Sequence, residues 1–327
     1  MTVLEAIQKS TEFLARKGVE SPRLQTELLL AHLLELPRMK LYLNFECALT
    51  AAETGTLREL IKRRGQREPL QHIVGSTSFC GLEMAVNRHA LVPRPETELL
   101  AEEGWKFLNG RAGSPQPAAA RSGNAPYPGL RALDLGTGTG CIAIALAVKC
   151  PDAKIVATDI SADALALAGE NAKRNGVTAR IEFLQSDGFA AVLKRWGGRT
   201  REPKENLSDG SPGGLPDRFD LLISNPPYIP SAEIAMLQPE VRDFDPRAAL
   251  DGGTDGLDFY RMLAMQAKPF LKADGKIMLE FGDDQAPAIR AIFDAEKWIV
   301  EAVKEDYSHR ARILIARPLS LATDLNK

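Results

Sequence analysis

The sequence predicts an α/β fold, in which helices cover both faces of a mostly parallel sheet, with a small helical region in front of it. From about residue 96 onward, short apolar runs alternate with helical patterns, which is typical of a parallel sheet. A glycine-rich turn over 136–140 separates one apolar run from an apolar helical pattern. The last two apolar runs are joined by 305–310 alone, which is too short for a helical crossover. An antiparallel C-terminal edge strand is therefore expected.

The first domain is expected to be helical and to span residues 1–75. Val3, Ile7 and Leu14 recur near helical spacing, Pro22 suits the first turn of a second helix, and 51–64 predicts a third. The domain contains no catalytic constellation. It is followed by a connector, residues 76–95, whose alternating apolar residues predict a β-hairpin.

The third expected domain spans residues 96–327. Strands are expected at 131–135, 154–158, 180–184, 219–224, 275–281, 298–304 and 311–316. Helices are expected at 96–108, 141–149, 161–175, 256–271 and 284–295. Two segments with few apolar residues, 110–129 and 197–217, are expected to be flexible insertions.

Composition limits the class of protein. The chain has 327 residues, enough for two cores, and a net charge of −2, which argues against a broad nucleic-acid-binding surface. Its 4 cysteines show no C-x-x-C spacing and its histidines share no ligand spacing, so no metal site is expected. The N-terminus lacks a signal pattern, and no apolar run approaches the roughly 18 residues of a membrane span. A cytoplasmic protein without membrane partners is expected.

The most informative motif is Asn225-Pro226-Pro227-Tyr228, which directly follows the apolar run 219–224. In open α/β sheets, ligands bind at the carboxyl ends of strands. Asn225 offers a side-chain carbonyl, and the two prolines remove N–H donors while leaving backbone carbonyls. Tyr228 adds a flat aromatic face. Such a rigid acceptor pair suits a planar group that bears an NH2, whereas the plainer alternative is a turn that ends a strand.

The glycine turn indicates a second ligand-binding element. Gly136, Gly138 and Gly140 allow a tight turn and a close approach of the backbone to a ligand. Asp159 ends the next apolar run, 19 residues after Gly140, where an acidic residue suits ribose hydroxyls. The turn alone also fits a dinucleotide. Asp134, close to the turn, disfavours a pyrophosphate, and this favours S-adenosylmethionine over NAD.

Together these motifs resemble those of the class I S-adenosylmethionine-dependent methyltransferases, and more closely the HemK/PrmC family of release factor glutamine methyltransferases. The resemblance covers nearly the whole chain and implies a Rossmann-like sheet. Its carriers are 67–75, 91–98, 134–140, 224–229 and 244–257. The Asn-Pro-Pro-Tyr motif alone is shared with amino-methyltransferases acting on DNA and RNA. The Pro-Arg-Pro-Glu-Thr-Glu run within 91–98, combined with 244–257, is more specific.

The resemblance also implies the site residues. S-adenosylmethionine would be bound by Gly136, Thr137, Gly138, Thr139, Gly140, Asp159, Asp187, Gly188 and Asn225. Asp187 would lie near the adenine, or it would cap a helix. Many relatives carry a bulky residue where this chain has Gly188. The substrate would be bound by Asn225, Pro226, Pro227 and Tyr228, and the catalytic residues would be Asn225, Pro226 and Tyr228.

Three charged residues have open roles. Glu96 suits the first turn of a helix, and it and Arg94 either cap that helix or lie near the site. Glu280 ends an apolar run, where it lines the pocket floor or caps the following helix.

Three functions follow from the sequence. The resemblance implies methylation of the glutamine in a Gly-Gly-Gln motif of class I peptide chain release factors, with the N-terminal domain gripping that protein substrate. The same acceptor pair also suits an amino-methyltransferase acting on adenine or guanine of nucleic acid. A non-catalytic module that keeps only the fold is the third. The acidic pI of about 6.2 and the 244–257 stretch favour the first over the second, and the intact glycines, Asp159 and Asn225 oppose the third.

Overall fold

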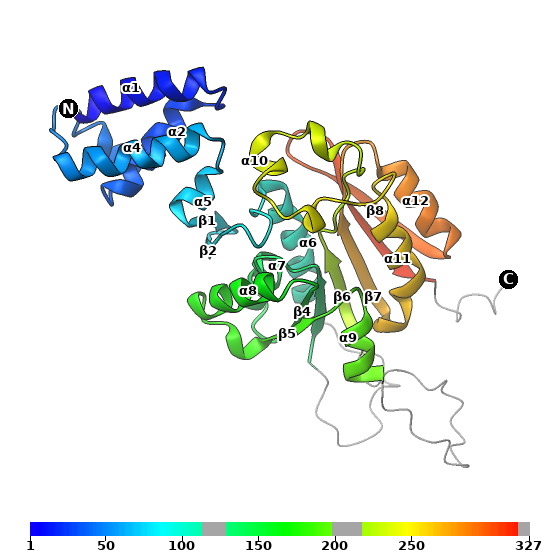
Figure 1. Cartoon of the computed structure of the whole chain (residues 1–327). Coiled ribbons are helices and arrows are strands. Elements are labelled where there is room, and N and C mark those ends of the chain that lie inside the picture. The colour runs from blue at the N-terminus through cyan, green and yellow to red at the C-terminus, as the bar shows by residue number, and fades with distance from the viewer. Residues whose placement is uncertain (113–128, 198–217, 320–327) are drawn as a thin grey trace, which may run out of the picture. The chain divides into compact units, whose positions relative to one another are not determined.

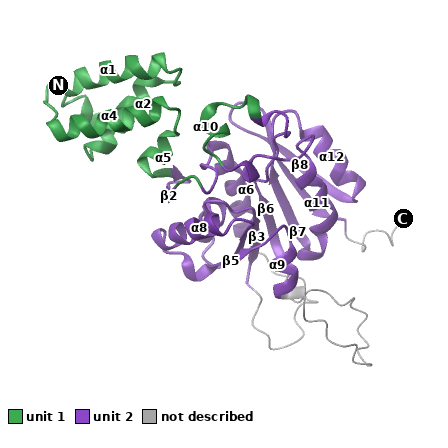
Figure 2. Ribbon diagram, viewed as in Figure 1, with its two compact units in different colours: residues 1–77, 86–88, 235–245 green, residues 78–85, 89–234, 246–327 purple. Residues whose placement is uncertain are grey.

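The computed structural model describes residues 1–112, 129–197 and 218–319. The chain divides into two compact units, which Figure 2 shows in different colours. Unit 1 contains residues 1–77, 86–88 and 235–245, and unit 2 contains residues 78–85, 89–234 and 246–327. Neither unit is therefore a single continuous stretch of the chain.

Unit 1 is built around a bundle of helices. These are α1 (Val3–Arg16), α2 (Pro22–Leu33), α3 (Arg38–Leu41), α4 (Ala51–Gly65) and α5 (Leu70–Val74). The three longer helices confirm the predicted ones, whereas the two short ones follow no periodic sequence pattern. Thr2 and Thr50 begin α1 and α4 with capping boxes, in which each threonine and a glutamate three residues later satisfy each other's backbone N–H. Leucines and isoleucines from all five helices, including Leu41 at the end of α3, form much of the core of the bundle.

A segment from much later in the chain completes unit 1. Residues 235–245, which include α10 (Pro239–Arg242), belong to it. Glu240 Oε1 accepts from Arg64 Nη2 at 2.7 Å and from Arg67 Nε at 2.7 Å, and Arg67 Nη2 donates to Oε2 at 2.6 Å. Burial acts to raise the pKa of Glu240, but the hydrogen bonds from Arg67 and Arg64 outweigh it and lower that pKa below its usual value.

Unit 2 contains a seven-stranded sheet in the order β5-β4-β3-β6-β7-β9-β8. The strands are β3 (Arg131–Leu135), β4 (Lys154–Asp159), β5 (Ile181–Gln185), β6 (Phe219–Ser224), β7 (Leu271–Glu280), β8 (Trp298–Glu305) and β9 (Ala311–Pro318). The first five are parallel, and β9 is antiparallel to both β7 and β8. This confirms the predicted sheet with its antiparallel C-terminal strand. Strand β9 lies between β7 and β8, so β8 is the outermost strand at this edge of the sheet.

Helices cover both faces of this sheet (Figure 1). Alternate residues of a strand point to opposite faces, so Leu221 and Ile223 of β6 enter one core and Leu222 enters the other. The first core also contains α6 (Pro95–Ala112), α7 (Cys141–Lys149) and α8 (Ala162–Arg174). The second contains α9 (Ala190–Val192), α11 (Asp258–Gln266) and α12 (Ala286–Ala295). This three-layer arrangement is the Rossmann-like architecture expected from the sequence.

Most predicted boundaries agree with the structure within a few residues, and the predicted hairpin is present as β1 (Ser76–Phe79) and β2 (Leu82–Ala85). The helix expected over 256–271 is shorter, because α11 ends at Gln266 and β7 begins at Leu271. Residues 110–112 of the first expected insertion belong instead to α6, which continues to Ala112. The rest of that segment to residue 128, and most of the other expected insertion, lie outside the described residues.

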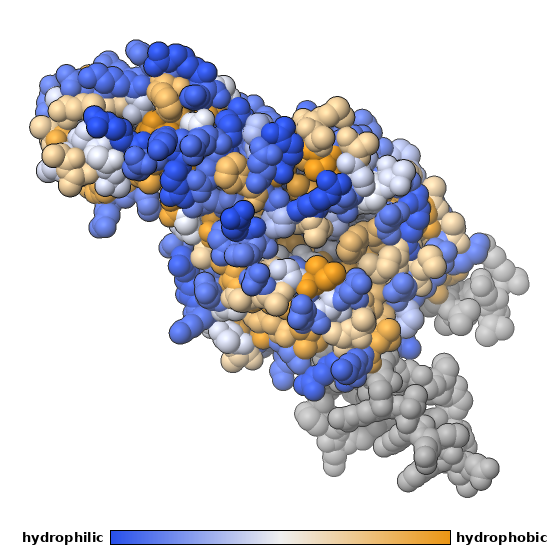
Figure 3. Space-filling model, in the orientation of Figure 1, coloured by the Kyte–Doolittle hydropathy of each residue, from blue (hydrophilic) through white to orange (hydrophobic). Residues whose placement is uncertain are grey.

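The described helices are all too short or too polar to cross a membrane. On the face drawn in Figure 3, hydrophobic residues are interspersed among hydrophilic ones over unit 2.

Candidate active site

Unit 2 contains a cavity of about 390 Å³ at the carboxyl ends of β3, β4, β5 and β6. Beyond β3 the strand order reverses, since β4 and β5 lie on one side of it and β6 on the other. Such a switch point is where ligands bind in open α/β sheets, and the volume falls in the usual range of about 300–1,000 Å³ for small-molecule sites. The fold alone therefore places a ligand cavity here.

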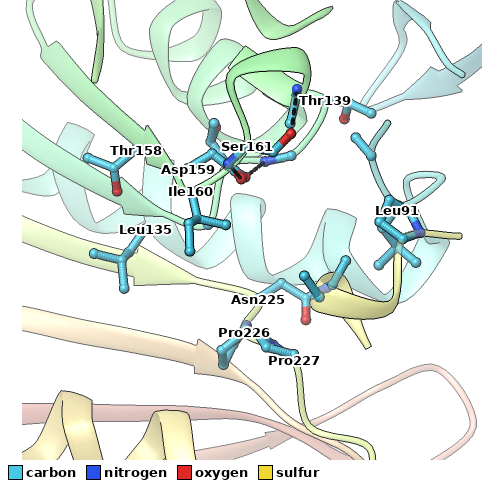
Figure 4. A pocket seen from close by; sticks show the side chains of 18 of the residues that line it. Leu91, Leu135, Thr139, Thr158, Asp159, Ile160, Ser161, Asn225, Pro226 and Pro227 are labelled. Atoms are coloured by element: carbon cyan, nitrogen blue, oxygen red, sulfur yellow. Dashed lines mark hydrogen bonds between the residues drawn. The ribbon is translucent and has the colours of Figure 1, made fainter. Parts of the chain in front are cut away.

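Most of the predicted site residues line this cavity. They are Gly136, Thr137, Gly138, Thr139, Asp159, Asp187, Gly188, Asn225, Pro226 and Pro227. Gly140 and Tyr228 do not line it. Figure 4 shows Asn225, Pro226 and Pro227 grouped on one side of the cavity, across from Asp159, Ile160 and Ser161.

The glycine turn after β3 has the conformation that its sequence requires. Gly136 and Gly140 have φ values of 74° and 80°, in the left-handed region that favours glycine. A Cβ on Gly140 would lie 3.0 Å from the Cβ of Ala168 and 3.1 Å from Cδ1 of Ile144. Gly140 therefore allows α7 and α8 to pack closely, whereas a Cβ on Gly136 would meet no atom within 4 Å.

Asp159 joins the end of β4 to this turn. Its Oδ2 accepts the Gly138 N–H at 2.8 Å, and its Oδ1 accepts the Ser161 N–H at 2.9 Å; Figure 4 shows Asp159 and Ser161 side by side. A carboxylate has about four acceptor sites, so each oxygen keeps one further lone pair. The side chain can thus accept two more hydrogen bonds on the cavity side.

Asp134 stabilises the turn from behind and is absent from the cavity wall. It is fully buried, and its Oδ2 accepts from Thr137 Oγ1 at 2.6 Å and from the Ala143 N–H at 3.2 Å. Burial raises the pKa of Asp134 to about 7, although both hydrogen bonds oppose the rise. Asp134 therefore braces the glycine turn through its bonds to Thr137 and Ala143.

The segment after β5 contributes Asp187 and Gly188 to the cavity. The capping hydrogen bond there comes from Ser186, whose Oγ accepts the Ala191 N–H at 2.9 Å. Ser186, and not Asp187, therefore provides the side-chain hydrogen bond at the start of α9. Gly188 has φ 53°, and a Cβ on it would meet only Met262, at 3.7 Å.

Asn225 lies at the end of β6, and the peptide bonds on both sides of Pro226 are trans. Its Nδ2 donates to Oγ1 of Thr97 at 3.1 Å. Thr97 lies in the first turn of α6 and is 3% exposed. The amide nitrogen of Asn225 is therefore engaged within the protein, and sequence reasoning did not identify its partner.

Tyr228 packs into the protein next to the cavity, against the core that contains α11 and α12. Burial raises the pKa of its hydroxyl to about 12. Its backbone carbonyl accepts from Gln285 Nε2 at 2.8 Å, and a Cβ on Gly256 would lie only 2.3 Å from that oxygen. A Cβ on Gly252 would likewise lie 2.9 Å from the carbonyl oxygen of Pro227. The glycines of the 244–257 stretch thus let it pack directly against the backbone of the Asn-Pro-Pro-Tyr motif.

Two further segments contribute to the cavity wall. Residues 89–94 supply His89, Ala90, Leu91, Pro93 and Arg94, and 246–251 supply Pro246, Ala248, Ala249 and Asp251. Arg94 thus lies at the site, whereas Glu96 does not line it. Both segments overlap motifs that carry the family resemblance. The resemblance could therefore have identified them as parts of the site. Among the described residues, no cluster of histidine, cysteine and acidic side chains could hold a metal ion.

Comparison with known proteins agrees with this architecture. Residues 5–75 match the PrmC N-terminal domain, and residues 127–312 match a methyltransferase domain. The release factor glutamine methyltransferase of Geobacter sulfurreducens is 41% identical over 292 residues, which cover 89% of this chain and 88% of the relative. The protein of that name from Chlorobaculum tepidum is 38% identical, covering 94% of each chain, and that from Agrobacterium fabrum is 36% identical, covering 97% of each. The chain belongs to the release factor glutamine methyltransferase family.

Proposed function

We propose that this chain transfers a methyl group from S-adenosylmethionine to the side-chain amide nitrogen of the glutamine in the Gly-Gly-Gln motif of class I peptide chain release factors. The names of its relatives supply the substrate class. The observation that carries the proposal is the position of Asn225 and Pro226, which line a cavity whose opposite side holds Asp159 and the glycine turn.

The cavity residues fit the cofactor. Asp159 keeps one lone pair on each carboxylate oxygen after accepting the Gly138 and Ser161 N–H groups, which matches the two hydroxyls of a ribose. Asp187 and Gly188 stand beyond the end of β5, next along the sheet, where the adenine would lie. The described cavity wall carries three carboxylates, Asp159, Asp187 and Asp251, against the guanidinium of Arg94, and this balance of charge suits a cationic sulfonium.

The acceptor pair fits an amide substrate. An amide nitrogen is a poor nucleophile because its lone pair is delocalised into the carbonyl. Asn225 Oδ1 would accept one N–H of the substrate NH2, and the Pro226 carbonyl would accept the other. Two acceptors orient the nitrogen and stabilise the positive charge that develops on it, and positioning alone can lower the barrier by up to about 7–11 kcal/mol.

When bound, S-adenosylmethionine supplies a sulfonium methyl whose C–S bond breaks as the C–N bond forms. The residues around the Asn-Pro-Pro-Tyr backbone hold the acceptors in place for this step. The nitrogen releases its proton only after it has gained the methyl group, so no strong base is required before attack. Tyr228 packs beside the cavity and supports the motif. Its ring lies close to Gly282, because a Cβ on Gly282 would be 2.9 Å from that ring.

The test is methyl transfer from radiolabelled cofactor to three acceptors: a purified class I release factor, RNA and DNA. We expect label in the release factor alone, and mass spectrometry should place it on the glutamine of the Gly-Gly-Gln loop. A release factor with alanine in place of that glutamine is the control and should stay unlabelled. Label only in RNA or DNA would replace the proposal with a nucleic-acid amino-methyltransferase. The cytoplasmic location expected from the sequence belongs to the same proposal, because the substrate acts in translation termination.

A further inference from the structure

Glu280 lies behind Asn225 and has no role in the proposed chemistry so far. It is the last residue of β7, which pairs with β6 so that Ser224 and Leu279 are neighbours. Glu280 is 3% exposed, does not line the cavity, and its Oε2 has no hydrogen-bond partner among the described residues. Burying a carboxyl oxygen without a hydrogen-bond partner costs stability, and ionisable groups in such surroundings cluster at functional sites.

Three side chains from three different elements meet at this point. Asn225 Nδ2 donates to Thr97 Oγ1 at 3.1 Å. The pairing of β6 with β7 places Asn225 beside Glu280, one residue beyond the Ser224–Leu279 pair, and the side chains of Thr97 and Asn225 both act to lower the pKa of Glu280. The hydroxyl of Thr97 has one proton to donate, and after accepting from Asn225 it can direct that proton at the carboxyl group.

The charge of Glu280 determines which end of the Asn225 amide faces it. A carboxylate only accepts hydrogen bonds, so it attracts the NH2 of an amide and repels its oxygen. If the amide of Asn225 were flipped, its Oδ1 would face the carboxylate and its NH2 would face the substrate. The substrate NH2 would then meet a donor where it needs an acceptor.

We propose that Glu280, with Thr97, is a positioning residue that holds the amide of Asn225 so that Oδ1 is the atom presented to the substrate nitrogen. The inference rests on the proposed function, in which that oxygen is one of the two acceptors. Glu280 touches neither the cavity nor a reacting atom, so it acts only through Asn225.

The ionisation of Glu280 should be visible in the pH dependence of turnover. Burial raises the pKa of Glu280 to about 7, and the nearby charge of Glu96 raises it further. The Thr97 hydroxyl, Arg312 and Asn225 act in the opposite direction and lower it. Tyr228 and Tyr260 also face it, and the pKa of each hydroxyl is raised, so both stay neutral near pH 7. Above its pKa Glu280 only accepts; below it, the protonated group can also donate to Asn225 Oδ1 and permits the flipped amide. Turnover should therefore rise with pH through about 7.

The kinetic test compares Glu280→Gln, Thr97→Val and Thr97→Ser with the wild-type protein on the release factor. Loss of the charge that orients the Asn225 amide predicts a fall in kcat of about 10- to 100-fold for Glu280→Gln, with cofactor affinity unchanged. The rise of kcat near pH 7 should also disappear. Thr97→Val should lower kcat, and Thr97→Ser, which keeps the hydroxyl, should restore it. Wild-type kcat and pH dependence in Glu280→Gln would overturn the inference, and so would equal losses of turnover and cofactor affinity.

A second measurement needs no substrate. In protein labelled with 15N-asparagine, the side-chain amide of Asn225 is assigned by its absence from the spectrum of Asn225→Ala. Its resonances should titrate near pH 7 in the wild-type protein and stay constant in Glu280→Gln; resonances that titrate identically in both would contradict the inference. If these resonances behave as expected but the wild-type protein labels no glutamine, the proposed function fails while the positioning role stands.

Discussion

Asp159 Oδ2 accepts the backbone N–H of Gly138 at 2.8 Å, which joins the end of β4 to the glycine turn after β3. The carboxylate therefore has two tasks: it holds the turn, and it keeps lone pairs for the ribose hydroxyls. Because hydrogen bonds to charged groups contribute about 1.5–3 kcal/mol, Asp159→Asn should weaken S-adenosylmethionine binding by about 10- to 100-fold or more. Isothermal titration calorimetry measures this. Asp152→Asn is the matched control, because Asp152 is exposed just before the start of β4, does not line the cavity, and its substitution removes the same charge. Equal effects of the two variants would contradict the assignment.

Asn225→Ala tests the acceptor role directly. Loss of a preorganised hydrogen-bonding group at a developing charge typically lowers kcat by about 10²–10³, so turnover on the release factor should fall by that factor. Affinity for S-adenosylmethionine should survive, because the acceptor faces the substrate. Asn109→Ala, an exposed change at the other end of α6, is the control and should leave both quantities unchanged. A parallel loss of cofactor affinity and turnover in Asn225→Ala would argue against a substrate acceptor.

Gly256→Ala should damage the site without touching the cavity. Gly256 has φ 76°, and its new Cβ would lie 2.3 Å from the carbonyl oxygen of Tyr228. The clash would displace the Asn-Pro-Pro-Tyr backbone, and a misplacement of about 1 Å can lower turnover roughly 10²-fold. Gly176→Ala is the control, since Gly176 has φ 69° but open space around its Cβ. That variant should show only the strain of the left-handed backbone, about 1–2 kcal/mol of unfolding free energy, with normal turnover. If both variants keep full turnover, the 250–256 stretch does not position the motif.

The sequence predicts the parts of the site that local patterns encode. Strand β6 and helix α7 coincide with their predicted bounds, because a buried apolar run and a glycine turn mark their ends. The role of Thr97 could not be predicted from local patterns. It lies 128 residues from Asn225, and a threonine in the first turn of a helix has an ordinary structural explanation. The inclusion of 235–245 in unit 1 is equally hidden, because Arg67 and Glu240 are 173 residues apart and no periodicity links them. Long-range polar pairs of this kind arise from the fold as a whole.

Glu240→Ala should release the 235–245 segment within unit 1. Arg64 is 4% exposed and would lose its anionic partner, and breaking a buried ion pair by removing one member typically costs about 3–5 kcal/mol. Hydrogen exchange of the 235–245 amides should become much faster. Glu20→Ala is the control, because Glu20 bonds Gln238 of the same segment at an exposed position and such contacts contribute about 1 kcal/mol or less. Unchanged protection in Glu240→Ala would show that other contacts hold the segment.

The lowered pKa of Glu240 also fixes the sign of its pH dependence. The folded-state pKa lies below the unfolded one, so its stabilisation is present above the unfolded pKa and is lost as pH falls through the folded pKa. Protection of 235–245 in the wild-type protein should therefore decrease in acid. In Glu240→Ala the protection should depend less on pH.

Asp134 should have the opposite sign. Burial raises its pKa to about 7 in the folded protein, from the usual 3.8, so between these values the folded state binds more protons than the unfolded state. The free energy of unfolding therefore falls, on account of this group, as pH rises from about 4 to about 7. Asp134→Asn cannot ionise, and it keeps an oxygen for the Thr137 hydroxyl and the Ala143 N–H. Denaturant unfolding of both proteins at pH 5 and pH 7.5 should show that the wild-type protein loses more stability over this interval than the variant. Identical losses would mean that Asp134 has the same charge at both pH values, and that burial does not govern its ionisation.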